Sequence, residues 1–537
     1  MSHSTHGYIV NNLTLPINAS HEEAFIIASK KLSAVGVNAR DADFRVYKRS
    51  VDARRKNDIK FVYSVLVSGD LPEVNENKLK ASGIVPYAYS APTFKIGEEK
   101  LENSVVVVGS GPCGLFCALL LAENGYKPII IERGGPISER NERIERFKRT
   151  RILDANTNIQ FGAGGAGTFS DGKLVTRVND SISSYVLERF VEFGAPSEIL
   201  YLAKPHIGTD VLSRVVDNML ARIEELGGKI MYHTRFIDYK TSGAGITGIL
   251  TNNGEISCSA LVLAIGHSAR DTYSTLIDRG FDIVAKPFSV GMRIEHSTEI
   301  IDRGMYGDFA GNARLGHAEY NLSYNTKDRG VYTFCMCPGG TVVAAASEEG
   351  GVVVNGMSAH ARDGRNSNSA VCCSIFKDDY GATPKAAIEY QRRIERAAFA
   401  AGGSDYSAPI ITVGDFLNGK CATEPSEILP TYMDGKGVKL ADPSKYLPNT
   451  VVEHIKRGLV DFDKKIKGFA HPCAVLSGAE TRTSSPLRIM RNNDTRLATG
   501  YDNLYPAGEG AGYAGGITSA AIDGIHTAIA IINRYKP

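Results

Sequence analysis

The sequence predicts an α/β protein of several domains: a parallel sheet, a small N-terminal α+β domain and an inserted, mostly antiparallel β domain. Three observations predict this architecture. An apolar strand, a glycine-rich turn, a helix and a second strand follow one another between residues 104 and 131. A continuous apolar run at 260–265 is typical of a strand buried on both faces. Short alternating runs between Pro-Gly and Glu-Gly turns at 286–429 are typical of antiparallel strands.

Length and composition agree with a folded protein of more than one domain. The chain has 537 residues, more than one hydrophobic core ordinarily organises. It is 43% hydrophobic and 22% charged, which excludes disorder as its general state. Sixty-one basic and 59 acidic residues leave a net charge of +2, so no global field attracts nucleic acid or an anionic membrane. We expect an N-terminal domain at 1–97, the first part of a central domain at 98–285, the inserted domain at 286–429 and the second part of the central domain at 430–537.

The N-terminus and the cysteines predict a cytoplasmic protein without a membrane span. Residues 1–12 lack the basic and apolar regions of a secretory signal. The most apolar stretch, 105–122, contains three glycines and a proline, which indicate a strand turning into a helix. Nine cysteines without framework spacing predict reduced thiols. Cys335 and Cys337 have no further ligands at metal-binding spacing, so we expect neither a metal site nor chemistry from them.

The first hundred residues predict a separate unit of strands and one helix. The expected strands are residues 7–15, 44–51 and 59–67. The last of these alternates strictly, as a sheet with one buried face requires. Ser20 and Glu23 form a capping-box pattern that begins the helix, and residues 86–92 read as a linker.

The elements of the central domain follow in order after that linker. We expect strands at 104–108, 127–131, 229–239 and 260–265, and helices ending at residue 125, at 209–226 and at 517–535. In the inserted domain, 331–337 and 341–346 are expected strands.

The turn after the first central strand carries a dinucleotide fingerprint. Gly109 permits the tight turn, Gly111 lets the backbone approach a pyrophosphate, and Gly114 allows close packing of helix on strand. Glu132 ends the next strand, 23 positions after Gly109, where an acid accepts from a ribose hydroxyl. Residues 162–167 match the same pattern, but no convincing strand precedes them. The sequence therefore predicts a Rossmann-type site in the turn that reads Gly109-Ser110-Gly111-Pro112-Cys113-Gly114.

The fingerprint alone leaves FAD and NAD open, and three further segments favour FAD by resemblance to flavoproteins of the glutathione reductase and p-hydroxybenzoate hydroxylase type. These segments are Glu132-Arg133-Gly134, the apolar strand ending at Gly266, and residues 504–517. The last resembles the motif in which an acid holds the ribityl chain and a helix N-terminus faces the pyrimidine ring, stabilising negative charge on reduced flavin. Most members of that type have Asp at the position of Glu509. The resemblance implies flavin contacts from Gly508, Glu509, Gly516 and Ile517.

Longer segments resemble a group of functionally uncharacterised bacterial FAD-dependent dehydrogenases that have a small domain before the flavin domain. The segments are 158–174, 480–488 and 505–517, and the likeness extends over nearly the whole chain. It implies the fold and non-covalent FAD, and it does not imply a substrate. In related flavoproteins the glycine- and serine-rich segment wraps the flavin, which implies FAD contacts from Gly164, Gly165, Ser170 and Asp171.

The sequence leaves the catalytic residues open. His206 precedes a helix where such folds approach the flavin ring, so it is a candidate proton shuttle, although a lone histidine is more often structural. Arg482 has three interpretations: it binds a substrate carboxylate, it binds flavin O2, or it pairs with Glu480.

These features predict an FAD-dependent oxidoreductase that moves a hydride between flavin N5 and a small organic molecule, with the inserted domain as a cap over the flavin ring. Only one dinucleotide fingerprint is credible, so NAD(P)H would reduce the flavin from the cleft without its own Rossmann domain, or electrons would come from the substrate or from a protein carrier. One alternative is an RNA-modifying flavoprotein that uses Arg54, Arg55 and Lys56, against which the near-zero net charge argues. The other is a redox sensor in which FAD is not turned over.

Overall fold

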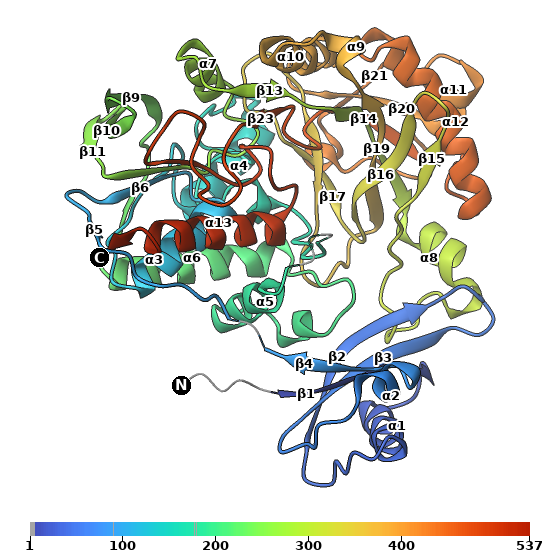
Figure 1. The fold of residues 1–537 in the computed structure, drawn as a ribbon. Helices are drawn as coiled ribbons and strands as arrows, with labels where there is room; N and C mark the ends of the chain where they lie inside the picture. The colour runs from blue at the N-terminus through green and yellow to red at the C-terminus, as the bar shows by residue number, and fades with distance from the viewer. Residues whose placement is uncertain (1–5, 90, 177, 179) are drawn as a thin grey trace.

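A computed structural model describes residues 6–89, 91–176, 178 and 180–537. These residues form a mixed α/β fold around three larger sheets (Figure 1). In Figure 1 the N-terminal sheet is blue, and the antiparallel sheet of the inserted part is yellow to orange. The C-terminal helix, in red, lies beside helices from the first half of the chain. Along this described part of the chain, no helix combines the length and the apolarity needed to cross a bilayer.

The N-terminal sheet is antiparallel, with strand order β2-β3-β1-β4. The predicted capping box is present, because Glu23 Oε1 accepts from Ser20 N at 3.0 Å. Pro86 lies in the last strand, so the segment 86–92 is not wholly the predicted linker; Ser90 within it lies outside the described residues. A proline is tolerated there because β4 is an edge strand. The elements are β1 (His6–Pro16), α1 (His21–Ala34), β2 (Asp43–Asp52), β3 (Lys60–Ser68), α2 (Glu76–Ala81) and β4 (Ile84–Ala88).

The edge strand β2 joins this sheet to the rest of the molecule. Arg49 N donates to Tyr201 O at 2.7 Å, and Arg49 O accepts from Ala203 N at 2.9 Å. Arg54, one of the basic residues considered for nucleic-acid binding, is paired with Asp52 at 2.6 Å.

The central sheet is parallel, with strand order β24-β12-β6-β7-β8. The predicted strand–turn–helix–strand unit is confirmed. Val105 and Val107 pack with helices on one face, and Val106 and Val108 pack on the opposite face, so β6 is buried on both sides. The elements are β6 (Val105–Val108), α3 (Pro112–Glu123), β7 (Ile129–Ile131), α4 (Ile137–Thr150), α5 (Ser183–Glu192), α6 (Thr209–Glu225), β8 (Lys229–Met231), β12 (Ala260–Leu263), α7 (Arg270–Asp278), β24 (Leu504–Pro506) and α13 (Ile517–Ile532).

The single strand predicted at 229–239 is wrong, because this segment forms two strands in different sheets. β8 ends at Met231, and β9 begins at Phe236 in the antiparallel sheet β11-β10-β9. Between them His233 has a φ of 52°, a left-handed conformation that a continuous strand excludes. The four residues 232–235 that separate the two strands contain neither glycine nor proline, so the sequence carries no turn signal there. The elements of this sheet are β9 (Phe236–Ser242), β10 (Gly245–Thr251) and β11 (Gly254–Ser257).

The inserted part is built on a mostly antiparallel sheet with strand order β15-β16-β19-β14-β22-β20-β21. Its strand β22 (Val475–Glu480) lies beyond the expected domain boundary at residue 429, yet pairs with β14 (Phe288–Ser297) and β20 (Ala408–Thr412). The sheet is therefore completed by residues from the predicted second central part. The other elements are β15 (Ser323–Asn325), β16 (Gly330–Cys337), β17 (Thr341–Ala344), β18 (Val354–Met357), β19 (Asn366–Ile375), α10 (Pro384–Ala401), β21 (Val438–Leu440) and α12 (Asn449–Lys465).

Candidate functional site

The fingerprint turn has the geometry that its glycines predict. A Cβ at Gly109, whose φ is 101°, would overlap Ala264 O, and a Cβ at Gly114 would overlap Gly109 O. Both positions require glycine for packing within the protein. At Gly111 the nearest described atom to an added Cβ is Gly165 Cα at 3.9 Å, an ordinary contact. The protein itself therefore tolerates a side chain at Gly111, and a ligand backbone contact is the remaining reason for glycine.

Glu132 connects three loops at the end of β7. Its Oε2 accepts from Ser110 N at 3.1 Å and from Ser110 Oγ at 2.8 Å. Its Oε1 accepts from Gly134 N and Gly162 N, both at 3.0 Å. The carboxylate therefore holds the fingerprint turn, its own strand end and the glycine-rich loop 162–167 together.

The glycine-rich loop packs directly on the fingerprint turn. Gly165 has a φ of 64°, and a Cβ there would lie 2.9 Å from Gly111 Cα. A Cβ at Gly164 would overlap Thr168 Oγ1, so neither Gly164 nor Gly165 has space for a side chain. The buried Arg140 donates to loop carbonyls, including Gly165 O at 3.0 Å. Burial lowers the pKa of Arg140 to about 9.

Ser170 and Asp171 lie at the far end of this loop, toward the inserted sheet. Ser170 Oγ donates to Gly167 O at 2.6 Å. Asp171 is buried and accepts from Arg362 Nε at 3.0 Å and from Ser358 Oγ. Its carboxylate is therefore neutralised by the inserted part, not by the turn at 109–114.

The C-terminal motif meets the same edge of the parallel sheet. Gly508 has a φ of 72°, its N donates to Asp523 Oδ2 at 2.7 Å, and a Cβ there would lie 2.8 Å from Cys113 Cβ. Glu509 Oε2 lies 3.3 Å from His267 Nδ1. Gly516 is the N-cap of α13, and no described heavy atom lies within 4 Å of a Cβ added there. The helix N-terminus is therefore open, as the approach of a flavin ring requires.

Two buried polar atoms along this edge lack partners. Gln160 and His267 are 6% and 9% exposed. Among the described residues, no hydrogen-bond partner reaches Nε2 of either side chain. Gln160 Oε1 is occupied, because it accepts from Ser268 Oγ at 3.0 Å. Since buried polar atoms are normally paired, the site fits a ligand rich in hydroxyl and phosphate groups, such as FAD.

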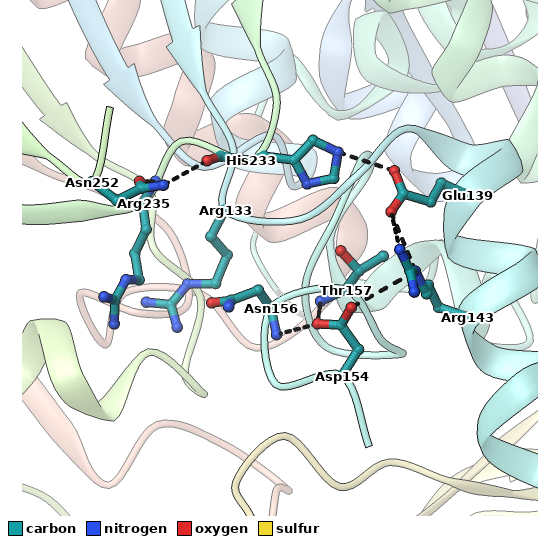
Figure 2. Close-up of a pocket in the computed structure, with 9 residues that line it drawn as sticks. All are labelled: Arg133, Glu139, Arg143, Asp154, Asn156, Thr157, His233, Arg235 and Asn252. Atoms are coloured by element: carbon teal, nitrogen blue, oxygen red, sulfur yellow. Dashed lines mark hydrogen bonds and ion pairs between the residues drawn. The ribbon is translucent and has the colours of Figure 1, made fainter. Parts of the chain in front are cut away.

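A cavity of about 430 Å³ adjoins the end of β7 (Figure 2). Arg133 and Arg235 approach each other at one side, and both pair with Asp271, at 2.7 and 3.3 Å. The guanidinium of Arg133 also lies 4.2 Å from the centre of the Phe161 ring. Sequence reasoning named only Arg133. Arg235 follows β8, and ligands of parallel sheets bind beyond the carboxyl ends of the strands. This rule could have identified Arg235 from the sequence. The cavity is lined by Arg133, Glu139, Arg143, Asp154, Asn156, Thr157, His233, Arg235 and Asn252.

His206 lies against the inserted part. Its Nε2 is 3.2 Å from His360 O, and the two rings stack with centroids 5.3 Å apart. Burial lowers the pKa of His206, so the neutral ring is favoured. Within the described chain, its buried Nδ1 has no partner.

Arg482 does not pair with Glu480, one of the interpretations left open. It is 4% exposed and grips Glu395 of α10, with Nε–Oε1 at 2.8 Å and Nη2–Oε2 at 3.1 Å. Its Nη1 donates to Ser268 Oγ at 2.7 Å. Glu480 pairs with Arg293 instead, at 3.0 Å. β22 ends at Glu480, so Arg482 leaves the strand and reaches a different element.

One further group of side chains was missed by the sequence analysis, which expected no metal site. Ligand atoms of Glu427, His471 and Cys473 lie within 4.8 Å of one another, a set that Zn²⁺ accepts. Glu427 and His471 are 44 positions apart, so a search for metal ligands at short spacing does not find this group.

Comparisons with known proteins agree with the flavin interpretation. The family described as FAD binding domain matches residues 102–150, the family described as FAD-dependent protein, C-terminal domain-like matches 287–483, and a domain of unknown function matches 9–68. An uncharacterized protein of Clostridium beijerinckii is 43% identical over 531 residues, covering 98% of each chain. This chain therefore belongs to the same family as that protein. The matched families identify FAD as the cofactor, as predicted, and make the chain a flavoprotein of the oxidoreductase class.

Solved structures resemble the chain only distantly. L-amino acid deaminase from Proteus vulgaris is 13% identical, with a TM-score of 0.34 over 83% of this chain and 96% of that one. Glycine oxidase from Bacillus cereus is 10% identical, with a TM-score of 0.32 over 81% and 98%.

Proposed function

We propose that this flavoprotein binds FAD non-covalently along the carboxyl edge of β6, β12 and β24 and moves a hydride between the flavin and a small organic substrate. One observation carries the proposal. Along this single edge lie the space for a Cβ at Gly111, the Nε2 atoms of Gln160 and His267, which have no partner among the described residues, and the open N-terminus of α13. In this proposal residues 98–285 and 430–537 supply a Rossmann-type FAD domain, and 286–429 supplies most of the cap.

Different residues along this edge contact different parts of the cofactor in this proposal. Backbone N–H groups at Gly111 and the N-terminus of α3 hold the pyrophosphate, since a helix N-terminus favours anions. Glu132 was predicted to accept from the adenosine ribose, but its two oxygens already accept from Ser110, Gly134 and Gly162, so its role in this proposal is to hold these loops in place. Arg133 and Arg235 line the cavity beside it. Glu509, oriented by His267, accepts from the ribityl chain. The N-terminus of α13 stabilises negative charge at the pyrimidine end of the ring.

The cap would exclude water and select the substrate. Bound FAD supplies a site that accepts and returns a hydride. Asp171 connects the glycine-rich loop to the cap through Arg362, which also donates to Glu319 at 2.6 Å. His206, held beside His360, stands at this junction as the candidate that moves a proton. Arg482 is a positioning residue in this proposal, because its donors are spent on Glu395 and Ser268.

A spectroscopic experiment tests this proposal. Purified protein reconstituted with FAD is expected to show a bound flavin spectrum, and anaerobic addition of its substrate is expected to bleach it. Small alcohols, amines, hydroxy acids and NAD(P)H form the first panel of reductants. A protein that binds no FAD would refute the placement of the site, and bound FAD that no small molecule reduces or reoxidises would refute the assigned reaction.

A further inference from the structure

Strand β16 carries a bulge at a Cys-Met-Cys sequence. The pairing of β16 with β19 shifts in register between Phe334 and Cys337. Cys335, inside the bulge, has a φ of 46°, which is costly for a residue with a Cβ. Bulges re-aim side chains and recur beside active sites. The bulge directs the two cysteines, two positions apart, to a common environment: Cys337 Sγ lies 3.4 Å from Cys335 O.

Two cations from different elements hold this bulge. Arg293 of β14 is fully buried, donates to Cys335 O, and places Nη2 3.5 Å from Cys337 Sγ. Lys173 donates to Met336 O. Lys173 follows Asp171 in the glycine- and serine-rich segment that the proposed function places against FAD, so the bulge contacts that segment.

The local charges favour a thiolate at one sulfur. A hydrogen bond from Cys337 lowers the pKa of Cys335 to about 6, with Arg293 and Lys173 acting in the same direction. Asp171 opposes this shift, and Glu480 lies in the same cluster. The hydrogen bond to Cys335 and burial raise the pKa of Cys337, so Cys337 keeps its proton.

The other buried cysteines do not share these properties. Burial raises the pKa of Cys372, which is adjacent in the same sheet, and the pKa values of Cys113 and Cys117 in α3. Packing alone therefore produces thiols that are harder to ionise. Cys335 is also partly exposed, whereas Cys337 is fully buried.

We propose that Cys335 and Cys337 form a redox-active dithiol pair that exchanges two electrons with FAD. The proposal rests on the proposed function, because FAD is the electron acceptor. The Cys335 thiolate and the Cys337 thiol form an S–S bond, the Cys337 proton is released, and two electrons with one proton reduce the flavin to its anionic reduced form. The reverse step regenerates the dithiol. Cys335 is the sulfur that an external disulfide or thiol reaches, and Cys337 resolves the mixed disulfide.

The first test uses FAD-free protein and does not depend on flavin chemistry. Iodoacetamide alkylation of each cysteine is followed by peptide mass spectrometry as a function of pH. The alkylation midpoint of Cys335 is expected near pH 6, below the ordinary thiol range. Cys337→Ala is expected to raise the Cys335 midpoint, and Cys421→Ser is the matched control. A Cys335 midpoint in the ordinary thiol range would overturn the proposal.

The second test measures electron transfer. Protein reduced with dithiothreitol, freed of it and mixed anaerobically with oxidised FAD is expected to bleach the flavin and to yield a Cys335–Cys337 disulfide peptide. Cys335→Ser and Cys337→Ala are each expected to bind FAD and leave it oxidised. Bleaching in either variant equal to wild type refutes the pair while the proposed function stands. Failure of wild type to bind FAD refutes both, and circular dichroism of the variants checks that they are folded.

Discussion

Gly111→Ala separates a requirement of the cofactor from a requirement of the fold. An added Cβ lies 3.9 Å from the nearest described atom, and the φ of Gly111 is −69°, which any residue adopts. The cofactor-free protein should therefore fold as well as wild type, or better by about 0.4–1 kcal/mol, since alanine reduces the entropy of the unfolded chain. The same Cβ occupies the place where a pyrophosphate would approach the backbone. Loss of one charge-assisted hydrogen bond costs about 1.5–3 kcal/mol, roughly a 10- to 150-fold increase in the Kd for FAD.

The matched control is Gly114→Ala, three residues along the same turn. Its Cβ would overlap Gly109 O, so destabilisation of about 1–3 kcal/mol is expected without FAD present. Thermal unfolding of both cofactor-free variants and FAD titration by fluorescence quenching give the two readouts. A wild-type Kd for Gly111→Ala would refute the position of the pyrophosphate. A loss of melting temperature in Gly111→Ala as large as in Gly114→Ala would refute the claim that its Cβ has space.

Three other changes have defined outcomes. Glu509→Ala should raise the Kd for FAD roughly 10- to 150-fold by removing a charged acceptor, and Glu509→Asp should largely preserve it; equal Kd values for Ala and wild type in fluorescence titrations would count against the ribityl assignment. Glu395→Gln should destabilise the protein by about 3–5 kcal/mol, because it leaves the buried Arg482 without a carboxylate and Arg270 with Glu348 alone; a change below 1 kcal/mol in urea unfolding would contradict this. Burial lowers the pKa of His296 to about 4, whereas in the unfolded chain its pKa is about 6.5. Between these values the unfolded chain binds a proton that the native protein does not, so the stability present above pH 6.5 is lost as the pH falls toward 4. His296→Gln should therefore lose less stability than wild type between pH 6.5 and 4.5, and parallel urea-unfolding profiles of the two proteins would disprove it.

The sequence alone predicted the features that depend on neighbouring residues. The capping box at Ser20 and Glu23, the βαβ unit and the glycine fingerprint are each specified within a few tens of residues, by hydrogen bonds or backbone conformations local to the chain. FAD as the cofactor followed from the order of such local motifs along the chain, and the matched families confirm it. The motif also predicted different roles for two of its glycines: Gly109 permits the tight turn, and Gly111 lets the backbone approach the pyrophosphate.

Only the tertiary structure decided which distant residues meet. Arg482 grips Glu395, 87 positions away, where the sequence offered Glu480 two positions away as the simplest partner. β22 joins the inserted sheet although the expected domain boundary precedes it by more than forty residues, because strand pairing is set by the packing of both faces and not by order in the chain. The placement of Cys335 and Cys337 beside the buried Arg293 has the same origin. Their spacing was visible in the sequence, but the bulge forms, and Arg293 and Lys173 reach it, only when three separate segments pack together. The packed interior has a low dielectric constant, and this makes the two charges strong enough to shift the pKa of a thiol.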